Sequence, residues 1–109
     1  MVKLELEQDV NKWFIQNYTR LGFKKILTLP EARQQKIFGA GDGMGDYWGF
    51  KNDKWLRIEL EVHSSTFFTH KKEVRDKIDV LICWKRSKSG LEKETELATK
   101  EVIELSKQI

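Results

Sequence analysis

The sequence predicts a small α/β domain, and three patterns carry this prediction. Apolar residues recur at helical spacing near the N-terminus, polar and apolar residues alternate around a two-residue turn, and a continuous apolar run follows a basic segment. At 109 residues, the chain is long enough to bury one core, and we expect residues 1–109 to form a single domain. The predicted order of elements is helix, strand, hairpin, crossover, strand and helix.

The first part of the chain predicts a helix, an apolar linker and a glycine-rich loop. From about Leu4 to Leu21 the apolar spacing is helical, and Gly22 ends the run. Residues 23–29 form a short apolar linker that can be extended, and residues 36–38 are expected to begin a strand. The loop at 39–45 holds four of the seven glycines. It precedes a strand rather than opening a helix, so it lacks the geometry of a phosphate-binding loop.

A β-hairpin is predicted over residues 46–63, with Asn52 and Asp53 at its turn. Alternation along its second strand gives one polar and one apolar face. Two carboxylates at positions i and i+2 repel each other unless a cation lies between them or water screens them. The pattern therefore indicates a metal site, with a solvent-facing sheet surface as the alternative. The polar face carries Trp55, Arg57, Glu59, Glu61 and His63, and the apolar face carries Leu56, Ile58, Leu60 and Val62.

The remaining chain predicts a crossover, a buried strand and a final helix. Residues 71–77 form a connecting turn or short helix, and residues 78–84 form a strand of the kind that is buried on both faces. The single cysteine, Cys83, lies in this strand as an expected core thiol, which excludes a disulfide framework and a cysteine zinc site. The final segment is predicted to be helical. Its apolar stripe consists of Ala98, Val102, Leu105 and Ile109.

The charge of the chain permits nucleic-acid binding without requiring it. The net charge is +3, the acids gather towards the two ends, and basic residues gather after the hairpin and after the next strand. This distribution suits contacts with phosphates, and an ordinary solvated surface is the alternative. The sequence has no apolar stretch typical of a signal peptide or a membrane span, so we expect a cytoplasmic protein. The candidate nucleic-acid-binding residues are Lys71, Lys72, Arg75, Lys85 and Arg86.

An acid that opens one strand, followed by E-x-(K/E) on the next, resembles the PD-(D/E)XK nuclease superfamily. Asp46 and Glu59 are spaced as two strands joined by a short turn would require. The run E-L-E-V-H-S-S-x-F-F-x-H, followed by D-V-L-I-C-W, also resembles little-characterised prokaryotic and viral proteins assigned to that fold. The resemblance covers about residues 7–84. It implies a restriction-endonuclease-like αβββαβ core, with a mixed sheet flanked by helices, to which this chain adds a C-terminal helix.

The resemblance also implies a function. It implies a Mg²⁺- or Mn²⁺-dependent endonuclease that hydrolyses phosphodiester bonds in DNA, branched or damaged DNA included, and acts as a homodimer. Asp46 and Glu59 would bind the metal, and Glu61 would bind the metal or orient water. His63 would position the phosphate or accept a proton. Glu7 occupies the region of the first helix where relatives place an additional acid.

Two positions depart from the superfamily pattern. Gly45 replaces the proline that precedes the acid, and Glu61 replaces the lysine of E-x-K, as in some restriction enzymes of the superfamily. In an alternative register, Glu61 pairs with His63, which then stands in for lysine. The missing lysine also leaves open a non-catalytic nucleic-acid-binding or assembly module with the nuclease fold. His70 is expected to be a loop or cap residue, with a phosphate contact as the alternative.

Overall fold

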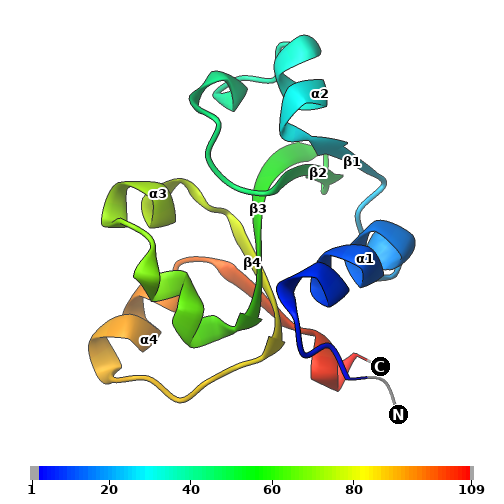
Figure 1. The fold of residues 1–109 in the computed structure, drawn as a ribbon. Coiled ribbons are helices and arrows are strands. Elements are labelled where there is room, and N and C mark those ends of the chain that lie inside the picture. The colour runs from blue at the N-terminus through cyan, green and yellow to red at the C-terminus, as the bar shows by residue number, and fades with distance from the viewer. Residues whose placement is uncertain (1–2, 109) are drawn as a thin grey trace.

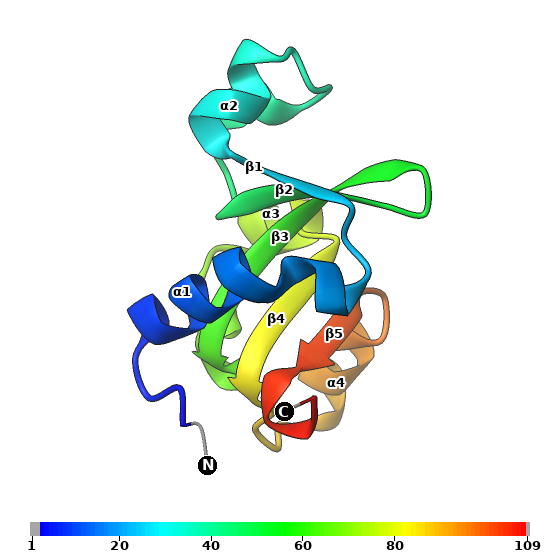
Figure 2. The same cartoon turned by 90° about the vertical axis from the view of Figure 1, so that its right-hand side faces the viewer.

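The computed structural model describes residues 3–108, and its centre is a five-stranded mixed sheet (Figures 1 and 2). The strands lie in chain order from β1 to β5. β1, β2 and β3 pair antiparallel, whereas β4 and β5 run parallel to their inner neighbours and are reached by crossovers. The α/β prediction with a mixed sheet is therefore confirmed. The strands are β1 (Lys25–Thr28), β2 (Tyr47–Lys51), β3 (Lys54–His63), β4 (Val80–Lys85) and β5 (Glu101–Glu104).

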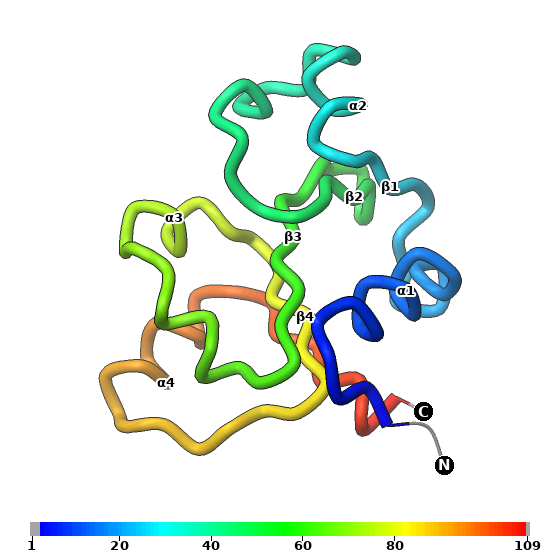
Figure 3. The backbone as a smooth tube through the Cα atoms, in the orientation of Figure 1, coloured from blue at the N-terminus to red at the C-terminus, as the bar shows by residue number. Residues whose placement is uncertain are grey.

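Helices cover both faces of the sheet. α1 lies on one face, while α3 and α4 lie on the other, together with the 3-10 turn η3 (Figure 1). α2 and the loop after it form a lobe beyond the β1–β2 end of the sheet, which the backbone trace shows clearly (Figure 3). None of the helices within residues 3–108 has the length and apolar run that crossing a bilayer requires. The helices are α1 (Glu7–Asn17), α2 (Leu29–Gln34), α3 (Lys72–Lys77) and α4 (Leu91–Leu97), and η3 spans Ser64–Thr69.

The sheet is packed on both faces, as the apolar run at 78–84 predicted. On the α1 side, the Phe14 ring lies 6.0 Å from that of Phe23 and 5.4 Å from that of Tyr47. On the opposite side, Phe67 of η3 is fully buried in a second cluster. Cys83 of β4 is buried, and burial raises the pKa of its thiol to about 12, so the expected core thiol is confirmed.

The hairpin prediction is confirmed. Asn52 and Asp53 join β2 to β3 with φ of 53° and 61°, the two positive values that a type I′ turn requires. Ile58 and Leu60 belong to the core on the α1 side, and Glu59 between them points to the opposite face. The predicted alternation along β3 is therefore confirmed as well.

Three segments differ from the prediction. Residues 25–28 form a strand of the sheet, and residues 36–38 form no strand because Lys36 has a left-handed φ of 59°. The final segment is helical only over α4, which ends at Leu97, and the prediction that the helix continues is wrong because β5 follows. Ile109 of the predicted stripe lies outside the described residues. Ile103 and Leu105 are buried at alternate positions, a spacing that also suits a strand, and pairing with β4 decides between the two.

Candidate metal centre

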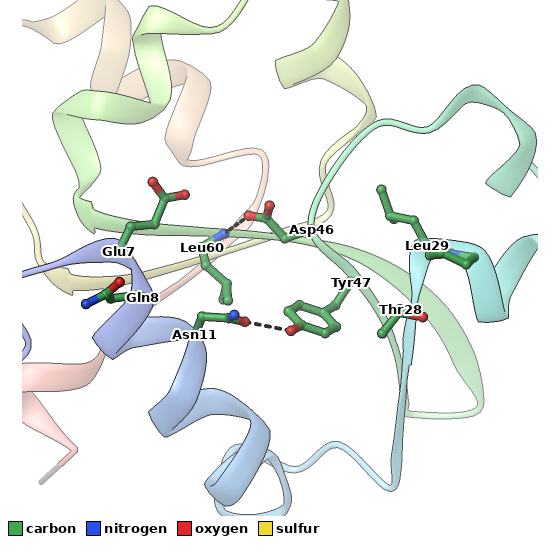
Figure 4. Close-up of a pocket in the computed structure, with 9 residues that line it drawn as sticks. Glu7, Gln8, Asn11, Thr28, Leu29, Asp46, Tyr47 and Leu60 are labelled. Carbon is green, nitrogen blue, oxygen red and sulfur yellow. Dashed lines mark hydrogen bonds between the residues drawn. The ribbon is translucent and has the colours of Figure 1, made fainter.

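The site forms where β3 extends past the start of β2. Tyr47, the first residue of β2, is opposite Ile58, so the rest of β3 has no β2 neighbour. Asp46 fills part of this gap: its N–H donates to the Ile58 carbonyl over 2.8 Å, and its Oδ2 accepts the N–H of Leu60 over 2.8 Å (Figure 4). The Asp46 carboxylate is thereby fixed at the edge of the sheet, beside Glu59.

The backbone before Asp46 strongly favours glycine. Gly45 has φ of 88°, which proline cannot adopt because its ring holds φ near −65°. A Cβ atom at Gly45 would also lie 2.9 Å from Cγ of Arg57. The departure from the superfamily proline thus has a local structural cause.

Glu59 and Glu61 lie on the sheet face that η3 covers, and they are only 5% and 3% exposed. The alternative of a solvent-facing sheet surface is therefore wrong. η3 turns the chain back over this face and places His70 against both acids. Its Nε2 lies 2.9 Å from Oε1 of Glu61 and 3.2 Å from Oε1 of Glu59. One ligand atom from each of the three residues lies within 4.8 Å of the other two, and we call this group the carboxylate–histidine cluster.

His70 is the residue that sequence reasoning did not place in the site. It occupies this position because Phe67, three residues earlier, is buried, with its ring 6.4 Å from the imidazole. The sequence feature that could have identified His70 is a histidine shortly after a strand that carries two acids on one face. His63 lies exposed at the end of β3 and outside the cluster. Alternation places His63 on the same sheet face as Glu59 and Glu61. His63 lies, however, beyond the part of that face that η3 covers.

Burial governs the electrostatics of the site. Burial, together with the negative charges of Asp46 and Glu61, raises the pKa of Glu59 to about 8. Burial also raises the pKa of Glu61, against the hydrogen bond from His70, and the pKa of Asp46, against the N–H of Leu60. Asp46 and Glu59 lie close enough to share a hydrogen bond. Acids held this closely retain protons or bind a cation.

Glu7 approaches the site from the first turn of α1. Its charge raises the pKa of both Asp46 and Glu59, although burial is the larger cause at each. Glu7 and Asp46 line a cavity of about 530 Å³ (Figure 4). On its floor, the Tyr47 hydroxyl donates to Oδ1 of Asn11 over 2.6 Å. The four predicted acids are therefore brought to one region, with a cavity beside them.

Three of the five candidate nucleic-acid-binding residues have partners within the chain. Arg75 pairs with Glu96 and donates to the carbonyl of His70 over 2.6 Å. Lys72 pairs with Asp76, and Arg86 pairs with Glu94. Lys71 and Lys85 are exposed. Arg75 thus has a second role that the sequence did not suggest, since it fixes the segment that carries His70.

The donor set fits a divalent cation. Carboxylate oxygens are the ligands of Mg²⁺ and Mn²⁺, and an imidazole nitrogen is a common ligand of first-row transition metals. The cluster offers both kinds of ligand, and burial raises the pKa of both acids, a shift that a bound cation would oppose. The chain matches no protein-family model, no curated protein and no solved structure.

Proposed function

We propose that this protein is a metal-dependent hydrolase of DNA phosphodiesters, related to the PD-(D/E)XK nucleases. The observation that carries the proposal is the burial of Glu59 and Glu61 against His70, with Asp46 adjoining them. Burying several acids together costs free energy that a hydrophobic set of the same size would not cost. Strongly shifted acids beside a cavity are typical of catalytic sites.

Mn²⁺ is the ion that suits this site better than Mg²⁺. Glu59, Glu61 and His70 would hold it. Asp46 lies outside this cluster but near Glu59, and it would add an oxygen ligand from the sheet edge. Mg²⁺ favours oxygen ligands and retains several waters, whereas a mixed oxygen and nitrogen set favours a transition metal. A bound divalent ion would lower the pKa of a water ligand and neutralise charge on the phosphate.

The chain's own residues supply the positioning. The N–H of Leu60 holds the Asp46 carboxylate, so this acid does not need to reorganise during the reaction. The cavity beside Glu7 has room for the sugar and phosphate of the substrate. The Tyr47 hydroxyl occupies Oδ1 of Asn11, which leaves the amide NH₂ group of Asn11 to donate to a phosphate or sugar oxygen.

The test is cleavage of plasmid, single-stranded and junction DNA in Mn²⁺, in Mg²⁺ and in EDTA. We expect cleavage in Mn²⁺ that Glu59→Gln and Glu61→Gln each abolish, because each removes one ligand charge. Glu92→Gln, at an exposed acid in the first turn of α4, is the matched control and should cleave as the wild type does. Calorimetric titration with Mn²⁺ measures the metal affinity separately. Equal cleavage by wild type and Glu59→Gln would contradict the proposal.

A second candidate is a non-catalytic nucleic-acid-binding module. The contact of His70 with both Glu59 and Glu61 favours it, because a protonated imidazole can offset the buried charge without a metal. Such a protein would shift DNA in a gel, bind Mn²⁺ no better than Glu61→Gln does, and cleave nothing.

A further inference from the structure

A second cavity, of about 440 Å³, lies between the α2 lobe and the sheet. Its lining includes three aromatic side chains, Phe38, Trp48 and Trp55, together with Arg57 and Lys77. None of these residues belongs to the carboxylate–histidine cluster. We call this space the aromatic cavity.

The aromatic cavity lies on the same face of the sheet as the cluster. Trp55, Arg57 and Glu59 are alternate residues of β3, so their side chains share one face at intervals of about 7 Å. Trp48 is opposite Arg57 in β2 and therefore lies on that face too. Two stacked nucleotides, at ~3.4 Å each, span one such interval. A strand whose phosphate lies at Glu59 thus reaches the aromatic cavity within a few nucleotides.

Two features of the cavity lining point to a ligand. Phe38 is 97% exposed, although a phenyl ring gains free energy by leaving water. Trp48 is buried, and its Nε1 is the one buried side-chain nitrogen or oxygen within residues 3–108 that has no hydrogen-bond partner. Burying a donor without an acceptor lowers the stability of the folded protein. A flat heterocycle would stack on the exposed phenyl ring.

The charges of the cavity favour a neutral ligand over a phosphate. The Arg57 guanidinium lies over the Trp48 ring at 4.5 Å and is held by the Asp42 carboxylate and the carbonyl of Gly39. Lys77 lies 3.1 Å from the same carboxylate. The nearby cations are therefore paired within the chain and are held in place before a ligand arrives.

We propose that the aromatic cavity binds one unpaired nucleobase of the strand whose phosphodiester lies at Glu59. The inference rests on the proposed function, and it narrows the substrate to single-stranded or locally unpaired DNA. Aromatic side chains bind bases by stacking with little dependence on sequence, because every base presents a flat face. The recognition is therefore of an unpaired structure rather than of a base sequence.

The test measures binding without cleavage. Fluorescence anisotropy of a labelled single-stranded 12-mer gives the affinity in Ca²⁺, which neutralises carboxylates, and in EDTA. We expect Phe38→Ala to weaken binding at least about five-fold, the low end of a lost stacking contact. Leu91→Ala removes another exposed apolar side chain, 85% exposed on α4, and should change the affinity less than two-fold. A 12-mer of abasic sites should bind the wild type and Phe38→Ala equally weakly.

The inference is overturned if Phe38→Ala binds the 12-mer as Leu91→Ala does, if intact duplex binds more tightly than the single strand, or if the wild type does not bind. These failures are separable from failure of the proposed function. Binding that depends on Phe38 without cleavage in any metal refutes the hydrolase and leaves the base site standing. Cleavage in Mn²⁺, combined with binding that ignores Phe38, refutes the base site alone.

Discussion

Nε2 of His70 lies 2.9 Å from Oε1 of Glu61, the residue that occupies the lysine position of the superfamily pattern. The imidazole reaches this place from the turn after β3 rather than from the strand itself. A protonated imidazole offers Glu61 the positive charge that a lysine side chain would otherwise bring. The same nitrogen, when unprotonated, is a metal ligand. Nε2 of His70 therefore serves both candidate functions: it is a metal ligand in the hydrolase and offsets the charge of Glu61 in the non-catalytic module.

Arg75 is predicted to control the metal affinity without touching the metal. Its guanidinium fixes the carbonyl of His70 and is itself fixed by Glu96. We expect Arg75→Gln to lower the Mn²⁺ affinity about ten-fold, as is usual when a group that orients a ligand is lost. Lys72→Gln, in the same helix, removes an equal charge and should leave the affinity unchanged. Calorimetry with Mn²⁺ measures the affinity of both variants. Equal affinities would show that Arg75 does not affect the metal site through His70.

The stability of the metal-free protein is predicted to fall as the pH rises. Burial and the neighbouring acids raise the pKa of Glu59 from 4.5 to about 8. Its proton therefore stabilises the folded state fully below pH 4.5 and ceases to do so as the pH passes about 8. Glu61 and Asp46 shift in the same direction. The loss between these pH values should be on the order of a few kcal/mol.

Urea unfolding in EDTA at pH 5, 7 and 9 measures this loss. Glu59→Gln carries no titrating group at this position, so its unfolding free energy should be close to that of the wild type at pH 5 and clearly higher at pH 9. Identical pH profiles for the two proteins would show that Glu59 titrates normally.

The parts that the sequence predicted are those encoded locally. The turn at Asn52 and Asp53 and the alternation along β3 depend on neighbouring residues, so both could be read from the chain. β5 could not, because its four residues are strand only by pairing with β4. His70 was missed for the same reason: its place at Glu61 depends on where the buried Phe67 anchors the turn.

Asp42 is predicted to stabilise the glycine-rich loop. Burial opposes its ionisation, but hydrogen bonds from Arg57, the N–H of Met44 and Lys77 outweigh burial and lower its pKa from 3.8 to about 2. Its contribution is therefore present above pH 3.8 and is lost as the pH falls through about 2. Allowing for partial exposure, Asp42→Asn should lower the unfolding free energy by about 1–2 kcal/mol at pH 7.

The matched control is Asp53→Asn at the hairpin turn, where the left-handed backbone suits asparagine equally well. It should leave the unfolding free energy at pH 7 unchanged. At pH 2 the deficit of Asp42→Asn should shrink, because the wild-type carboxylate is then about half protonated in the folded state. A deficit independent of pH would mean that the ionised carboxylate contributes nothing.

Gly45→Pro introduces the proline of the superfamily pattern that the sequence resembles, and it is nevertheless predicted to destroy the site. The φ of 88° at Gly45 turns the chain so that Asp46 can bond to both Ile58 and Leu60, and proline cannot adopt this angle. We expect a loss of about 3 kcal/mol or more in unfolding free energy and loss of Mn²⁺ binding where the protein still folds.

Two further glycine variants separate backbone angle from side-chain size. Gly45→Ala should lose about 1–3 kcal/mol, because its Cβ would meet Cγ of Arg57 in a strained conformation. Gly41→Ala, in the same loop, meets no atom within 4 Å and has no positive φ, so its stability should be unchanged or slightly raised. Urea unfolding and Mn²⁺ titration of the three variants decide the matter. Full stability and metal binding in Gly45→Pro would mean that the position of Asp46 does not depend on this turn. The proposed role of Asp46 at the sheet edge would then be wrong.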